Sequence, residues 1–160
     1  MIIKSFDPVI SSSCTKIILG TMPGKTSLKK KQYYGHGGNR FWEVIAKIFG
    51  SDKKDAYPLK CSTLLANGIA LWDVLESCER KNSSDKNIIN PTLNNFEDFF
   101  LSYPKIKQII FNGTPPSEFY NSMVKNDFGK QIAVSLTTSP WSRVLYKDDY
   151  YFDSWRQILK

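Results

Sequence analysis

Four short apolar segments alternate along the chain with longer segments in which apolar residues recur at helical spacing. The apolar segments have the length of single buried strands and comprise residues 16–20, 69–72, 107–111 and 131–136. The segments with helical spacing comprise residues 40–49, 58–66, 94–101, 115–124 and 148–159. This alternation predicts an α/β fold in three layers, α/β/α, with a central, mainly parallel four-stranded sheet covered by helices on both faces.

Residues that favour turns and helix ends separate these segments. Pro115 is tolerated at the first position of a helix, and Asn94 or Asn95 is suited to cap the helix that follows it. The segment of residues 77–91 is polar and ends in an Asn-Pro pair, so we expect it to form a loop.

The composition is that of a packed protein. The chain has 160 residues, of which 41% are hydrophobic and 14% aromatic, and we expect a single domain over residues 1–160. No apolar run approaches the ~20 residues that cross a bilayer, and the N-terminus lacks the apolar core of a secretory signal. These features predict a cytoplasmic protein that does not enter the membrane.

Metal and disulfide chemistry are not indicated by the pattern of ligand-type residues. Cys14, Cys61 and Cys78 are odd in number and form no Cys-x-x-Cys pair, and the chain has one histidine. We expect reduced, partly buried thiols and no bound metal.

The charge favours a polyanionic partner. The 22 basic and 15 acidic residues give a net charge of +7. Lys25 and the run from Lys29 to Lys31 precede the adjacent aromatics Tyr33 and Tyr34. A lysine run by itself is typical of a solvated face, but cations beside aromatic planes are what an unpaired nucleic acid strand requires.

The segment between the first strand and the first long helix is the most informative part of the chain. It runs from Gly20 to Arg40 as a long loop with glycine and proline punctuation. Loops of this length in compact domains are usually functional. In α/β folds ligands bind beyond the carboxyl ends of the strands, which is where this loop begins.

A phosphate-binding loop is one interpretation of the start of this segment. Gly20 and Gly24-Lys25-Thr26 resemble the nucleotide-binding motif, with Asp73 as a candidate magnesium ligand. The motif needs four residues between its glycines, whereas three are present here, and Pro23 removes one amide donor. The spacing therefore disfavours this interpretation.

Several motifs together resemble the uracil-DNA glycosylase superfamily, and most closely its hypoxanthine (deoxyinosine) DNA glycosylase branch. In chain order the motifs are Gly20-Thr21-Met22-Pro23-Gly24, the run from Gln32 to Trp42, Gly68 to Leu75, Ser77 to Arg80, Phe111-Asn112-Gly113 and Thr138-Ser139-Pro140. Mismatch-specific uracil glycosylases share the His-x-x-Asn-x-Phe-Trp portion. Gly37 stands where the family usually has proline, and Trp141 where the branch usually has a small residue.

The resemblance implies a three-layer fold and a monofunctional DNA glycosylase that hydrolyses the N-glycosidic bond of deaminated bases. Its expected substrate is DNA containing hypoxanthine, with uracil as a second candidate. It implies neither a metal nor an organic cofactor, and we expect a monomer. The alternatives are a mismatch-specific uracil-DNA glycosylase and a catalytically silent module that binds single-stranded DNA.

Base binding is expected from three places in the chain. Gly20, Thr21, Met22, Pro23 and Gly24 would form one wall, with backbone amides facing the departing base; the alternative is a tight turn without chemistry. Tyr34 would stack on the flipped base, unless it serves only loop packing, while Tyr33 would pack inward. Asn112 would form two hydrogen bonds to the base edge, or else only a turn with the glycine that follows.

Asn39 is the expected catalytic residue. Relatives carry an acidic or amide side chain in the first motif, where this chain has Met22, and the resemblance shifts the task of positioning water to Asn39. An amide is a poor base, so it would act by holding the water near the sugar carbon. The alternative is that Asn39 caps the following helix, and the two roles are compatible.

The remaining candidates would contact DNA. Ser139 and Pro140 would hold flanking phosphates together with Lys25 and Arg143, and Trp141 would fill the vacated stack as an apolar wedge, the alternative being a packed tryptophan after a turn. His36 is expected to be an orienting or structural group, the alternative being a general acid. Asp73 would support the pocket from behind, although the sequence does not place it.

Overall fold

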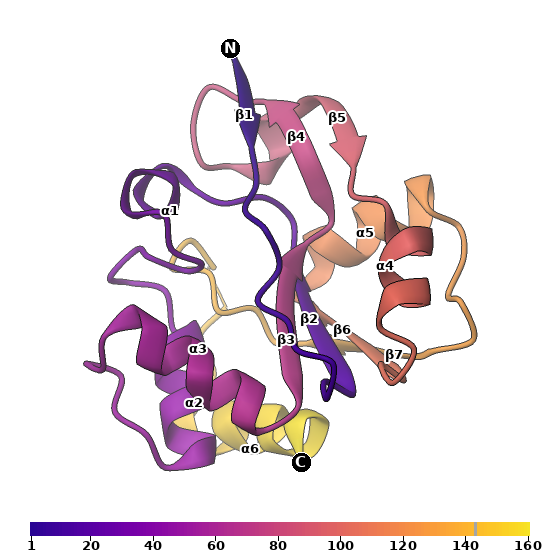
Figure 1. Cartoon of the computed structure of the whole chain (residues 1–160). Coiled ribbons are helices and arrows are strands. Elements are labelled where there is room, and N and C mark those ends of the chain that lie inside the picture. The colour runs from indigo at the N-terminus through magenta and orange to yellow at the C-terminus, as the bar shows by residue number, and fades with distance from the viewer. Residues whose placement is uncertain (143) are drawn as a thin grey trace.

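The computed structural model describes residues 1–142 and 144–160. Its centre is a sheet of four parallel strands in the order β3-β2-β6-β7 (Figure 1). The strands are β2 (Lys16–Gly20), β3 (Ile69–Asp73), β6 (Gln108–Asn112) and β7 (Gln131–Ser135). The predicted fold class and all four predicted strands are confirmed.

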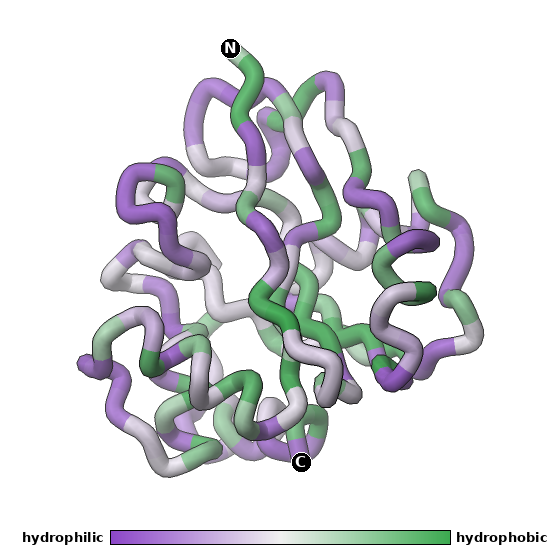
Figure 2. Tube along the Cα trace, in the orientation of Figure 1, coloured by the Kyte–Doolittle hydropathy of each residue, from purple (hydrophilic) through white to green (hydrophobic). Residues whose placement is uncertain are grey.

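Helices cover both faces of this sheet. One face carries α2 (Phe41–Phe49), α3 (Tyr57–Ala66) and α6 (Asp148–Leu159), and the other carries α4 (Phe96–Ser102) and α5 (Thr114–Met123). Successive strand residues point to opposite faces, so Ile18 joins the core beneath α2 and α6 while Ile17 and Leu19 join the core beneath α4 and α5. A parallel sheet covered in this way needs strands that are apolar throughout, and Figure 2 shows these hydrophobic strands at the centre of the molecule.

A second sheet, which the sequence analysis missed, lies beside the first. β1 (Ile2–Lys4), β4 (Leu75–Glu79) and β5 (Ile89–Leu93) form it in the antiparallel order β1-β4-β5, and the 3-10 helix η1 (Asp85–Asn87) connects β4 to β5. The prediction of a loop over residues 77–91 was therefore wrong. Register shifts interrupt the pairing of β4 with β5, and most of β5 is exposed. These strands consequently lack a regular apolar alternation.

The long segment between β2 and α2 is also more ordered than a loop. It contains the short helix α1 (Lys25–Lys30), which ends at Lys31 in the left-handed conformation, with φ 55°. Lys29 and Lys30 lie in its last turn, where cations favour the carbonyl end of a helix. Leu28 is its one large apolar residue, so periodicity had no signal to detect. Among the described residues, no helix has both the length and the apolar character needed to cross a membrane.

Candidate active site

The carboxyl ends of the parallel strands converge on one cavity of about 210 Å³. The chain leaves β2 toward β3 on one side of it and leaves β6 toward β7 on the other. The point between β2 and β6, where the connections diverge, is the topological switch point at which open α/β sheets bind ligands. Gly20 ends β2 and Asn112 ends β6, so the cavity lies where the sheet topology favours a ligand site.

The structure brings together every predicted site residue that it describes. The cavity is lined by Gly20, Thr21, Met22, Pro23, Gly24, Lys25, Tyr34, His36, Asn39, Asn112, Ser139, Pro140 and Trp141. Arg143, the remaining candidate, lies outside the described residues. The cavity is also lined by Asp73 and Asp85, which sequence reasoning had not placed there.

The wall formed by Gly20 to Gly24 is fixed by backbone hydrogen bonds and close contacts. The N–H of Val74 donates to the Gly20 carbonyl over 2.8 Å, which continues the pairing of β2 with β3. A Cβ atom on Gly20 would lie 2.6 Å from Asp73 Oδ1 and 2.9 Å from the Tyr34 hydroxyl. Glycine is therefore required at position 20, because these two polar groups occupy the space of a side chain.

Arg80 supports the same wall from the second sheet. Its side chain is only 1% exposed. One guanidinium nitrogen donates to the Pro23 carbonyl, and the other lies 3.4 Å from Asp85 Oδ1. Arg80 was part of a quoted motif, but sequence reasoning assigned it no role, because its partners come from the first-motif loop and η1.

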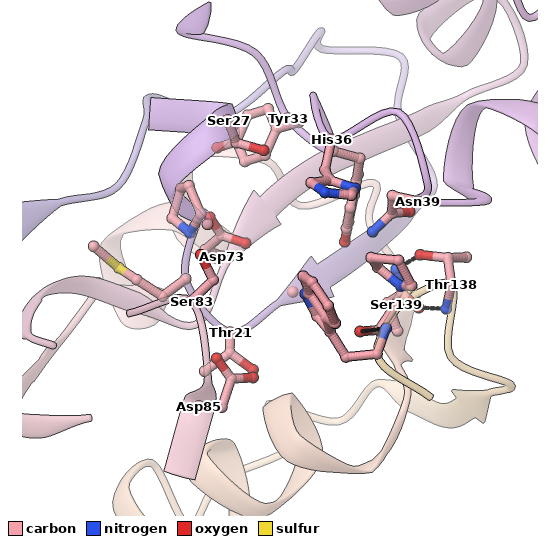
Figure 3. A pocket seen from close by; sticks show the side chains of 18 of the residues that line it. Thr21, Ser27, Tyr33, His36, Asn39, Asp73, Ser83, Asp85, Thr138 and Ser139 are labelled. Atoms are coloured by element: carbon pink, nitrogen blue, oxygen red, sulfur yellow. Dashed lines mark hydrogen bonds between the residues drawn. The ribbon is translucent and has the colours of Figure 1, made fainter. Parts of the chain in front are cut away.

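Asn39 faces the cavity with a fixed orientation (Figure 3). Its Oδ1 accepts a hydrogen bond of 2.9 Å from the N–H of Phe41, the first residue of α2. Because only the oxygen can accept from this donor, the amide nitrogen is left for the cavity. The backbone N–H of Arg40 also donates to the Thr138 carbonyl over 3.0 Å, which ties this loop to the segment after β7. Asn39 thus contacts the start of the helix and lines the cavity at once.

Tyr34 is held in a strained position between Phe41 and the cavity. It has a positive φ of 53°, which is uncommon for a residue with a large side chain. Its ring stacks on Phe41 with centroids 4.1 Å apart. Its hydroxyl is buried, and no described residue hydrogen-bonds to it. The expected inward packing of Tyr33 is confirmed, since that side chain is buried and its hydroxyl donates to the Asp7 carbonyl.

Asn112 and Thr138 form a reciprocal pair. The Asn112 amide nitrogen donates to the Thr138 hydroxyl over 2.8 Å, and its oxygen accepts from the Thr138 N–H over 3.1 Å. These two bonds fix which end of the amide is the donor. One N–H and one oxygen lone pair of Asn112 remain for another partner.

Asp73 lies at the end of β3, deep in the cavity, and is 4% exposed. Its Oδ2 atom is buried, and no described residue hydrogen-bonds to it. Burial raises the pKa of Asp73 to about 8; the charge of Asp85 adds to this effect, whereas Arg80 opposes it. The sequence could suggest Asp73 only as a support behind the pocket, because its neighbours in the cavity come from other strands and loops.

The rim of the cavity is formed by two loops in contact. A Cβ atom on Gly38 would lie 3.1 Å from Pro140, so the loop before α2 packs closely on the segment after β7. The Trp141 side chain is 70% exposed and its ring lies 5.7 Å from that of His36. The Ser139 hydroxyl accepts from the N–H of Trp141 and fixes the turn on which this aromatic stands.

A larger groove of about 780 Å³ continues from this rim. Lys25, Ser83, Ser139 and Trp141 line both spaces, so the two are contiguous. The groove is open to the exterior and carries cationic, hydroxyl and aromatic side chains, the groups that suit a nucleic acid backbone and its bases.

Comparisons with known proteins agree with this architecture. The sequence model of the Uracil DNA glycosylase superfamily matches residues 8–160. The hypoxanthine DNA glycosylase of Methanosarcina barkeri is 36% identical over 141 residues, which is 88% of each chain. That of Methanosarcina acetivorans is 37% identical over 120 residues, covering 74% of this chain and 76% of the relative. The solution structure of a candidate uracil DNA glycosylase from the latter organism superimposes with a TM-score of 0.83, at 31% identity over 99% of both chains.

The chain belongs to the uracil DNA glycosylase superfamily. It is a DNA glycosylase, a hydrolase that cleaves N-glycosyl bonds in DNA. Membership of this family replaces the phosphate-loop interpretation of Gly20 to Thr26.

Proposed function

We propose that this glycosylase removes deaminated bases from DNA, with hypoxanthine as its main substrate and uracil as a second one. The observation that carries the proposal is the oriented Asn39 amide in a cavity at the switch point of the sheet. The two hypoxanthine DNA glycosylases at 36% and 37% identity support the choice of substrate. The product would be an abasic site in an uncut strand.

The cavity must receive a base that has left the duplex. Rotating a nucleotide out of the stack costs a few kcal/mol, and least for a damaged or poorly paired base. We assign the wall from Gly20 to Gly24 to the flipped base, because glycine lets the backbone approach a ligand closely. Its backbone amides would stabilise negative charge that develops on the departing base.

We assign Asn39 to the nucleophilic water. The Phe41 N–H occupies Oδ1, so the amide nitrogen donates to the water and leaves a water lone pair for the sugar carbon. This arrangement positions the water without deprotonating it. Such positioning suits a reaction in which the sugar becomes cationic before the water attacks.

We assign Asn112 and Tyr34 to recognition of the base. Hypoxanthine and uracil both present a ring N–H beside a carbonyl. The free oxygen lone pair of Asn112 can accept from the ring N–H, and its free N–H can donate to the carbonyl. Phe41 covers one face of the Tyr34 ring, so the opposite face is the one offered to the base. A stacking contact of this kind is worth about 1–3 kcal/mol.

We assign the contiguous groove to the DNA strand on either side of the flipped nucleotide. Lys25, Ser139 and Pro140 would contact the backbone at the mouth of the cavity, and Arg143 would add charge to this segment. His36 would steady Trp141, whose exposed ring would fill the space that the base leaves.

The experiment is a comparison of wild type with Asn39→Ala on oligonucleotides that carry a single hypoxanthine, uracil or xanthine. We expect wild type to release hypoxanthine, which alkali then reveals as a strand break. Asn39→Ala should lose release by at least about a hundredfold and bind the same DNA with affinity close to that of wild type. Full release by Asn39→Ala would remove the assignment.

The same measurements separate the alternatives. Preference for U:G over I:C and I:T pairs would identify a mismatch-specific uracil glycosylase. Tight, salt-dependent binding without release of any base would identify a silent single-strand binding module.

A further inference from the structure

Two buried polar atoms without a hydrogen-bond partner in the described part of the chain belong to residues that line the cavity beside Gly20. They are Asp73 Oδ2 and the Tyr34 hydroxyl, both buried, and no described residue hydrogen-bonds to either. Both groups lie next to the place where Gly20 lacks a side chain, since a Cβ there would contact the Asp73 carboxyl and the Tyr34 hydroxyl alike. A buried polar group without a partner costs about 1–3 kcal/mol, so a pair of them in one cavity indicates polar atoms of a ligand.

Asp73 also lies across the cavity from Asn39 (Figure 3). If Asn39 holds the water beside the sugar, Asp73 is placed on the side that receives the base. The base leaves with the electron pair of the glycosidic bond and is therefore negatively charged unless it gains a proton. A carboxylate would repel such a base, whereas a neutral carboxylic acid would stabilise it.

We propose that Asp73 is a second catalytic residue, which as a buried neutral acid gives its proton to the departing base. This inference rests on the proposed function. The C1′–N9 bond of deoxyinosine breaks and its electron pair goes to the base. The proton of Asp73 passes to a ring nitrogen of that base, and the oxygen of water bonds to C1′. The proton that the water loses returns through solvent to the Asp73 carboxylate, so the acid is restored at the end of each cycle.

The surroundings of Asp73 favour its neutral form. Burial is the main cause of its raised pKa, and the nearby carboxylate of Asp85 acts in the same direction. Arg80 is the cation that opposes them among the described residues, and it is already bonded to Asp85 and to the Pro23 carbonyl. The other titratable groups around the carboxyl are Tyr33, Tyr34 and Tyr57, whose pKa values are all raised by burial, while Lys25 and His36 lie at the cavity lining.

The test is the pH dependence of hypoxanthine release by wild type and by Asp73→Asn under single-turnover conditions. In wild type we expect the rate to fall as pH rises through about 8, because the acid ionises there. Asparagine cannot give up a proton, so the variant should be slower by about a hundredfold at pH 6 and should not show the fall. The rate of wild type divided by the rate of Asp73→Asn should therefore decrease above pH 8.

Asp85→Asn is the matched control, since Asp85 lines the same cavity but bonds to Arg80. It should keep the alkaline fall and move it to lower pH, because one negative charge near Asp73 is removed. Equal rates for wild type and Asp73→Asn, or a ratio that is constant with pH, would overturn the acid role while leaving the proposed function intact. No release by wild type from any lesion would overturn the proposed function, and this inference with it.

Thermal unfolding provides a readout that does not depend on activity. The pKa of Asp73 is higher in the folded than in the unfolded chain, so between about pH 4 and pH 8 the folded state binds the additional proton. This part of the stability is present below pH 4 and is lost as pH rises to 8. The melting temperature of Asp73→Asn should match that of wild type at pH 4 and exceed it increasingly up to pH 8. A difference that does not change with pH would show that Asp73 is not held neutral.

Discussion

Two glycines near the cavity have opposite surroundings. A side chain on Gly20 would collide with the Asp73 carboxyl and the Tyr34 hydroxyl, whereas a Cβ on Gly37 would meet no atom within 4 Å. The backbone of Gly37 does not have a positive φ, so a residue with a side chain is compatible with the fold at that position. Comparing alanine substitutions at the two positions therefore tests whether base release depends on the close packing at Gly20.

We expect Gly20→Ala to lower the free energy of unfolding by about 1–3 kcal/mol through overpacking and to slow base release at least tenfold. Gly37→Ala should keep release and raise the free energy of unfolding by about 0.4–1 kcal/mol, because it restricts the unfolded chain. Urea unfolding and single-turnover release measure both effects. If Gly20→Ala matched wild type in stability and in base release, the residues around Gly20 could move to accommodate a side chain, and the prediction would be wrong.

At the scale of elements, the small antiparallel sheet supports the wall of the cavity. Arg80 follows β4, and its guanidinium bridges the Pro23 carbonyl and Asp85, the first residue of η1. The second sheet is thus connected to the wall from Gly20 to Gly24 through one buried cation. The start of the wall is held from the other side, since the N–H groups of Val74 and Leu75 donate to the carbonyls of Gly20 and Thr21.

Replacing Arg80 by methionine keeps much of the length of the side chain and removes both bonds. We expect a loss of about 1–3 kcal/mol in the free energy of unfolding, since polar partners are left unpaired, and a greater loss in base release than in DNA binding. Arg156→Met is the control, because Arg156 forms only a surface pair with Asp153. Equal effects of the two substitutions would argue against a role for Arg80 in holding the wall.

At the scale of the whole molecule, charge and the exposed rim determine how DNA is engaged. The net charge of +7 favours association with phosphates, a contribution that salt weakens. Trp141 stands exposed at the junction of the cavity and the larger groove. A wedge there would compensate for unstacking, which a duplex requires and a single strand largely does not.

We therefore expect Trp141→Ala to reduce hypoxanthine release from duplex DNA about tenfold, equivalent to about 1.4 kcal/mol, and to affect single-stranded DNA much less. The dependence of binding on salt should stay unchanged, because no charge is removed. Tyr150→Ala is the control, since Tyr150 is exposed on α6, outside both spaces. Equal losses on duplex and single strand would contradict the wedge.

The sequence by itself determined the alternation of strands and helices and much of the cavity lining. Apolar strands such as Lys16–Gly20 and the amphipathic helix after Asn39 are local patterns, and parallel strands bring their carboxyl ends to one edge. The resemblance to the uracil-DNA glycosylase superfamily assigned residues as distant in sequence as Gly20, Asn39 and Asn112 to one site, and the parallel strands place Gly20 and Asn112 at the same edge of the sheet. The short helix α1 and the strands β4 and β5 were missed, because they lack a regular apolar period.

Only the tertiary structure decided how the polar groups are paired. Thr138 hydrogen-bonds to both the nitrogen and the oxygen of the Asn112 amide. The Phe41 N–H fixes the orientation of the Asn39 amide. Asp73 and Tyr34, from β3 and from the loop before α2, are left without partners in the same cavity. Hydrogen bonding and burial depend on the atoms that surround a side chain in space. The free energy of ionising a group such as the Asp73 carboxyl depends in turn on its hydrogen bonds and its burial. No local pattern in the chain carries that information.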